Sequence, residues 1–166
     1  MAIETPSSTD EHVLAALIYA ESTVVHGTEP SEEMLAIGWT ARNRYLHVQN
    51  HASDRKWWGN GSDMESIAKG NGGREFVSVS GPRYTTFRNH LGEITNSLEV
   101  AFGNLAVKAA KAVLAAPAPK VPGVFGTYPY VWFQRGSTSP SKRACATPTS
   151  LGSHYFWSFA PGGEKG

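Results

Sequence analysis

The chain has 166 residues and a mass of 17.9 kDa, which suits one compact domain with a real core. Its formal net charge is +1, so no strong field indicates nucleic acid or a membrane surface as a partner. The single cysteine, Cys145, excludes an internal disulfide and a multi-thiolate metal site. The first residues have neither a basic n-region nor an apolar h-region, so we expect no secretory signal.

The first third of the chain predicts two amphipathic helices joined by a loop. Asp10 is a suitable N-cap, and apolar residues then recur at helical spacing over residues 11–21. Residues 23–29 predict a loop. Pro30 opens a second helix, and two glutamates lie in its first turn, where the helix macrodipole favours acids.

The rest of the chain predicts shorter elements and one long helix. In order they are a short helix over 64–69, a strand over 75–80, helices over 84–91 and 93–116, and extended segments over 128–133 and 154–159. Neither a repeat period nor a break in composition marks a second domain. We therefore expect one helix-rich α+β domain with a small hairpin or sheet, spanning 11–160, with a flexible lead over 1–10 and a tail over 161–166.

Glu21 is the residue that a purely structural role explains least. It lies four positions after Leu17 and seven after Leu14, so helical spacing places it on the apolar face. Desolvation there disfavours the ionised carboxylate, which is how a general acid stays protonated near neutral pH. The alternative is that Glu21 ends the helix facing solvent, or pairs with Arg42 or Arg44.

A glycosidase usually needs a second carboxylate, or a water held opposite the acid. Glu29, in the loop after the first helix, and Glu75, at the start of the predicted strand, are the candidates. Glu32 and Glu33 are better explained as acids at a helix start. Retaining, inverting and intramolecular routes all stay open, because the sequence does not give the distance between carboxylates.

Aromatic side chains could line a carbohydrate groove, since sugar C–H faces stack on rings. Trp57 and Trp58 are the least core-like of them, because they adjoin in a polar segment. The full set is Trp57, Trp58, Tyr84, Tyr128, Tyr130, Trp132, Tyr155 and Trp157.

Other chemistries are less well supported. The six histidines lack the spacing of a metal motif, so we expect no metal and no cofactor. Cys145 with His154 could form the thiol–histidine pair of a cell-wall amidase. Cys145, however, is predicted in a loop and not at a helix N-terminus, which would lower the pKa of its thiol.

Residues 17–44, LIYAESTVVHGTEPSEEMLAIGWTARNR, resemble the opening of the spore-cortex and cell-wall hydrolase family. The matching residues are Ile18, Tyr19, Ala20, Glu21, Gly27, Glu29, Pro30, Ala36, Asn43 and Arg44. Glu21-Ser22 is also similar to the start of the lytic transglycosylase motif. In both groups this glutamate is the catalytic acid, so the resemblance implies that role for Glu21.

Two further segments are similar to the same family. Glu75-Phe76 resembles its "QFS" strand, and residues 146–156 resemble a terminal "DPTGGATHFY" segment that aligns His154 and Tyr155. The chain departs from the family by an insertion after Glu21, by Thr147 in place of an Asp, and by lacking the Gly-Leu-Met-Gln hairpin of transglycosylases. The resemblance therefore implies the wider lysozyme-like superfamily and not one subfamily.

The resemblance implies a lysozyme-like peptidoglycan hydrolase that cleaves MurNAc–GlcNAc β-1,4 bonds. Its implied substrate-binding residues are Ser22, Trp57, Trp58, Tyr84, His154 and Tyr155. With no visible signal, we expect synthesis in the cytoplasm and delivery by type VI secretion into a rival's periplasm. A cognate immunity protein would cover the active cleft, and neither nucleic-acid binding nor membrane insertion is expected. The alternatives are a phage endolysin, a lytic transglycosylase and a non-catalytic glycan-binding module.

Overall fold

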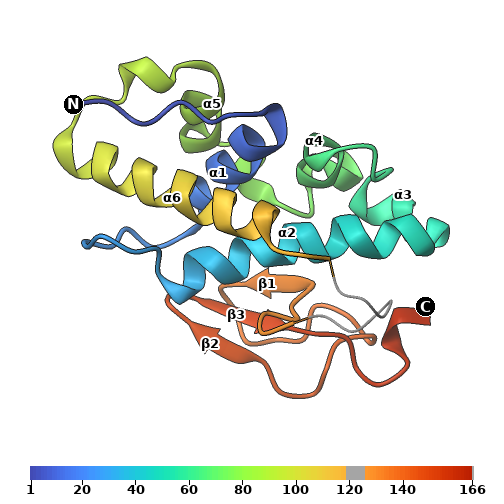
Figure 1. The fold of residues 1–166 in the computed structure, drawn as a ribbon. Helices are drawn as coiled ribbons and strands as arrows, with labels where there is room; N and C mark the ends of the chain where they lie inside the picture. The colour runs from blue at the N-terminus through green and yellow to red at the C-terminus, as the bar shows by residue number, and fades with distance from the viewer. Residues whose placement is uncertain (119–125, 166) are drawn as a thin grey trace.

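The computed structural model describes residues 1–118 and 126–165 and shows a helix-rich α+β domain with a small antiparallel sheet, as predicted. Figure 1 shows the helices stacked on one side of α2 and the sheet on the other. The helices are α1 Thr9–Glu21, α2 Glu32–Asn50, α3 Arg55–Trp58, α4 Met64–Ala68, α5 Pro82–Asn89 and α6 Ser97–Ala115. The strands are β1 Trp132–Gln134, β2 Thr149–Leu151 and β3 His154–Trp157. Short 3₁₀ turns cover Ala52–Asp54, Gly70–Gly73, Val77–Ser80, Leu91–Glu93 and Gly163–Lys165.

Helix α1 is the central element of the core. Its residues from Val13 to Tyr19 are all buried, and it packs against α2, α4, α5 and α6. A helix that is apolar all round belongs in an interior. Glu21 is its last residue, so a rigid core helix fixes the position of that carboxyl. No helix in the described ranges is long and apolar enough to cross a membrane.

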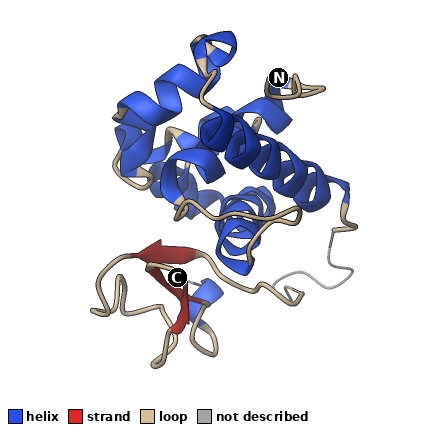
Figure 2. Ribbon diagram, turned by 90° about the vertical axis from the view of Figure 1, so that its left-hand side faces the viewer, coloured by secondary structure: helices blue, strands red, loops and turns tan. Residues whose placement is uncertain are grey.

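The sheet has the strand order β1-β3-β2, with every pair antiparallel. Leu151 pairs with His154 across the tight β2–β3 turn, so His154 lies at the beginning of the central strand. Figure 2, turned by 90°, shows the sheet as a separate layer below the helices. Strand β1 contacts α2, so the sheet holds His154 near the helical layer.

Asn43 and Arg44 of α2 join the two layers. The Asn43 amide donates to the Tyr128 and Tyr130 carbonyls at 2.8 and 2.9 Å, and Arg44 Nε donates to the Val131 carbonyl at 2.7 Å. Both side chains are buried. A buried guanidinium and a buried carboxamide that donate to backbone carbonyls fix the approach of the chain to β1.

The helix starts differ from the sequence expectations by a few residues. Ser8, not Asp10, caps α1, since its hydroxyl accepts from the Glu11 amide; Asp10 instead accepts from the Met64 amide. The long helix begins at Ser97 and not at residue 93, because the Asn96 side chain accepts from two amides in the first turn. Leu98, in the first turn of α6, is 57% exposed although it lies in the apolar repeat of the predicted helix.

The strand predicted over 75–80 is also wrong. Val77–Ser80 forms a 3₁₀ turn that leads directly into α5 at Pro82. The alternation of apolar and polar residues predicted a half-buried strand, but Val77 is 74% exposed and its neighbour Phe76 is buried. The helix predicted over 64–69 is confirmed as α4.

Both ends of the described chain make contacts with the domain. Ile3 is buried against Gly103, and the Glu4 amide donates to Asn104. Near the other end, Arg143 donates to both carboxylate oxygens of Asp54 at 2.8 Å and to the Gly163 carbonyl at 2.6 Å. The boundaries drawn at residues 10 and 160 stay a prediction.

Candidate active site

Glu21, Glu33 and His154 form one buried cluster, which we call the Glu–His–Glu cluster. They come from the end of α1, the first turn of α2 and the start of β3. His154 lies between the two acids: its Nδ1 is 3.2 Å from Glu33 Oε2, and its Nε2 is 3.7 Å from Glu21 Oε2. The His154 and Glu33 side chains are 2% and 3% exposed, and that of Glu21 is 14% exposed. Glu21 is therefore the member with the most access to solvent.

Backbone amides hold Glu33 in place. Its carboxylate accepts from the Thr23 amide at 2.5 Å and from the Ser153 amide at 2.6 Å. Thr23 lies in the loop after α1 and Ser153 in the β2–β3 turn, so Glu33 joins both segments to α2. Buried charge needs such hydrogen bonds to offset its desolvation.

Glu21 has its own backbone donor. The Ser78 amide, in the 3₁₀ turn before α5, donates to Glu21 Oε1 at 3.2 Å. One carboxylate oxygen therefore faces Ser78 and the other faces His154. The Glu21 side chain is oriented from two sides, as a reacting group requires.

The cluster strongly shifts two of its pKa values. Burial alone would lower the pKa of His154, but bonding to Glu21 and Glu33 raises it to about 8. Burial alone would raise the pKa of Glu33, but His154 and the two amides lower it to about 2. At neutral pH the imidazole is therefore protonated and Glu33 is ionised.

The expectation that Glu21 has a raised pKa is wrong for the free protein. Burial does raise it, but the His154 imidazole 3.7 Å away and the hydrogen bond from the Ser78 amide outweigh burial, so the pKa lies below its ordinary value. Glu21 and His154 together carry one proton at neutral pH, and that proton lies on the imidazole. Glu21 also pairs with neither Arg42, which bonds the Val113 carbonyl, nor Arg44.

The other predicted acids lie outside the cluster. Glu29 is 72% exposed and pairs with Lys108 at 2.6 Å, while Glu75 pairs with the buried Arg44 at 3.4 Å. Glu33, explained from sequence as a helix-start acid, takes their expected place beside Glu21. One sequence signal could have found it: Glu33 lies four positions before the buried Ile37, the same spacing that marked Glu21.

The predicted substrate-binding residues are divided between core and surface. Ser22 donates to the Ile18 carbonyl at the end of α1, and Trp58 is buried against Trp132. Both therefore have structural contacts. Trp57 is 47% exposed on α3, and Tyr155 is half-buried next to His154.

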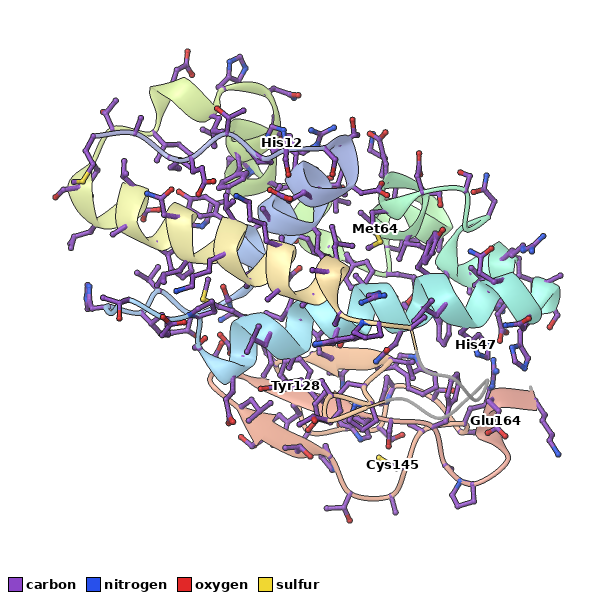
Figure 3. The ribbon with its side chains drawn as sticks, in the orientation of Figure 1. His12, His47, Met64, Tyr128, Cys145 and Glu164 are labelled. Carbon is purple, nitrogen blue, oxygen red and sulfur yellow. The ribbon has the colours of Figure 1, made fainter. Side chains whose placement is uncertain are left out.

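The positions of Cys145 and His154 do not support the thiol–histidine alternative. Cys145 lies among the loops on the sheet side (Figure 3), where its thiol donates to the Thr147 carbonyl at 3.3 Å. Both His154 nitrogens face glutamates instead. Within residues 1–118 and 126–165, no group of three or more His, Cys, Asp or Glu side chains is placed to hold a metal ion. In the cluster, the two carboxylates face different nitrogens of one ring and do not converge on a shared point.

Gly152 leaves the space that Glu33 occupies. Its φ is +58°, and a Cβ added there would overlap the Glu33 carboxylate. We expect Gly152→Ala to lower the free energy of unfolding by about 1–3 kcal/mol, through backbone strain and displacement of a buried charge. Thermal unfolding of Gly152→Ala measures this loss of stability. Gly136→Ala is the control, because a Cβ added there meets no atom within 4 Å. Equal melting temperatures for the two variants would contradict the packing described here.

The chain gives no significant match to a family model, to a curated protein or to a solved structure. The Glu–His–Glu cluster and the sequence resemblance are therefore the features that bear on function.

Proposed function

We propose that this protein is a peptidoglycan glycan-strand hydrolase of the lysozyme-like superfamily, cleaving MurNAc–GlcNAc bonds with Glu21 as the catalytic acid. One observation carries the proposal: two of the three segments that resemble cell-wall hydrolases, 17–44 and 146–156, meet in the Glu–His–Glu cluster, while Glu75-Phe76 lies outside it. Glu33 and His154 are 121 positions apart in the chain, yet they bond directly. A chance resemblance gives no reason for these two segments to meet at the Glu21 carboxyl.

The cluster suits the storage and delivery of a proton. His154 is too buried to touch a glycan, whereas Glu21 reaches solvent. A sugar lying over Glu21 would exclude water. Desolvation disfavours the charged carboxylate and imidazolium and favours a neutral carboxylic acid beside a neutral imidazole. In this proposal the proton passes from His154 Nε2 to Glu21 Oε2. Glu21 then gives it to the glycosidic oxygen as the C–O bond breaks, and the water that completes the hydrolysis returns a proton to the pair.

Glu33 acts in this proposal as a positioning residue and not as the nucleophile. Its side chain is 3% exposed, and its oxygens already accept from Thr23, Ser153 and His154. It keeps His154 charged and correctly oriented. The group that attacks the anomeric carbon is then water or the substrate's own N-acetyl group, which fits the intramolecular route.

Two exposed apolar side chains lie next to the residues whose amides donate to Glu21 and Glu33. Val77, 74% exposed, precedes Ser78, and Val24, 44% exposed, follows Thr23. We propose that glycan, and a cognate immunity protein, cover this surface beside Glu21. Synthesis in the cytoplasm followed by delivery to a target periplasm, by type VI secretion, is part of the proposal; release as a phage endolysin is the alternative.

Mass spectrometry of the soluble products from purified peptidoglycan tests the reaction. We expect muropeptides with reducing ends, because water completes the cleavage. Products with 1,6-anhydro ends would make the protein a lytic transglycosylase. Free amines that disappear in Cys145→Ala would make it an amidase, and binding without any product would make it a glycan-binding module.

A further inference from the structure

A polar pocket lies between α4 and α5, outside the Glu–His–Glu cluster. It has a volume of about 170 Å³, and its lining includes Glu65, Lys69, Val79, Tyr84 and Arg88. Its size suits a small charged group better than a sugar ring, since pockets for drug-sized ligands begin near roughly 300 Å³.

The charges in this pocket leave one cation without a partner. Lys69 pairs with Glu65 at 2.9 Å across one turn of α4. Arg88 forms no ion pair with any side chain in the described ranges. A guanidinium offers a planar fork of donors that matches a carboxylate. The pocket therefore favours an anion.

The Tyr84 hydroxyl, beside Arg88, supplies a second sign of a ligand. The Tyr84 side chain is 4% exposed, and its hydroxyl is buried with no hydrogen-bond partner among the described residues. Buried hydroxyls are nearly always bonded, because an unmade hydrogen bond there costs free energy. An anionic oxygen in the pocket would accept from both this hydroxyl and Arg88.

The pocket adjoins the candidate active site through the 3₁₀ turn Val77–Ser80. Val79 lines the pocket, and its neighbour Ser78 donates its amide to Glu21. A substrate whose scissile bond lies at Glu21 would therefore have its adjacent groups near Lys69 and Arg88. In peptidoglycan, those adjacent groups are the peptide stems on the MurNAc residues, which carry free carboxylates.

We propose that this pocket binds a carboxylate of the peptidoglycan peptide stem, with Arg88 and Tyr84 as its donors. The inference rests on the proposed glycan-strand hydrolase function and adds a requirement for the peptide. Arg88 and Tyr84 are then specificity residues: they make peptide-bearing strands better substrates than bare ones.

Kinetics on two substrates test this requirement. For Arg88→Glu we expect KM to rise about tenfold or more on peptide-bearing glycan, and to stay within about twofold on strands stripped of peptide. Arg135→Glu, a charge reversal at an exposed position outside the pocket, is the matched control. Equal KM values for Arg88→Glu and wild type on peptide-bearing glycan would overturn the proposal.

A binding experiment separates this proposal from the proposed function. The wild-type protein is titrated with the isolated peptide stem, with the same peptide carrying amidated carboxylates, and with inorganic phosphate, while NMR follows Tyr84 and Arg88. We expect shifts with the acidic peptide, none with the amidated one, and loss of the shifts in Arg88→Glu and Tyr84→Phe. Phosphate binding as tightly as the acidic peptide, or no shift with that peptide, would overturn the pocket assignment. A protein that binds the peptide but cuts no glycan would overturn only the hydrolase function.

Discussion

Glu21→Gln should reduce the release of reducing ends from peptidoglycan by at least about 10³-fold, with the fold intact. The amide side chain keeps the shape of Glu21 and can still accept from the Ser78 amide, but it cannot carry a proton to the glycosidic oxygen. The loss should therefore appear in kcat more than in KM. Reducing-end release under steady-state conditions measures it, and thermal unfolding shows whether the variant is folded.

Glu29→Gln is the matched control for this substitution. Glu29 is the second acid that the family resemblance implies, but its exposed carboxylate pairs with Lys108. We expect activity close to that of the wild type. A loss in Glu29→Gln as large as in Glu21→Gln would show that the Glu–His–Glu cluster is not the complete acid machinery.

His154→Gln should change the pH dependence of the reaction as well as its rate. The pKa of His154 is raised to about 8, so the imidazole keeps its proton through neutrality and loses it above that pH. Wild-type kcat/KM should therefore fall on the alkaline side near pH 8, as a property of the coupled Glu21–His154 pair. In His154→Gln the alkaline fall should move to lower pH, toward the ordinary range of a carboxyl, and kcat at pH 7 should drop by about 10²-fold or more.

A merely structural His154 would give a different result. Glutamine can still donate to a carboxylate of the cluster, so a structural role predicts a lower melting temperature with an unchanged pH profile. An alkaline fall that stays near pH 8 in the variant would contradict proton storage on this histidine.

Local sequence pattern was sufficient to predict the helix that places Glu21. The apolar spacing before it predicts α1, and the burial of its middle part follows from the unbroken apolar run Val13–Ile18. The strand predicted over 75–80 does not form, because its tertiary surroundings do not support one. Alternating residues specify a strand only where a partner strand and a buried face exist, and Val77 faces solvent there.

The electrostatics of the site depend on contacts that no local pattern contains. Burial on an apolar helical face correctly predicts a desolvated Glu21, but the sign of its pKa shift is set by His154. His154 reaches it because the sheet packs against α2, where Asn43 and Arg44 donate to the backbone of the segment before β1. The sequence explained Glu33 only as an acid at a helix start. Its partners Thr23 and Ser153 belong to other segments, so no local pattern reveals them.

Glycan cleavage by Glu21 is tested by comparing wild type and Glu21→Gln on intact, purified peptidoglycan at neutral pH, with mass spectrometry of the soluble fraction. We expect muropeptides ending in reducing MurNAc from the wild type and none above background from the variant. Soluble products released equally by both proteins, or none released by the folded wild type, would contradict it.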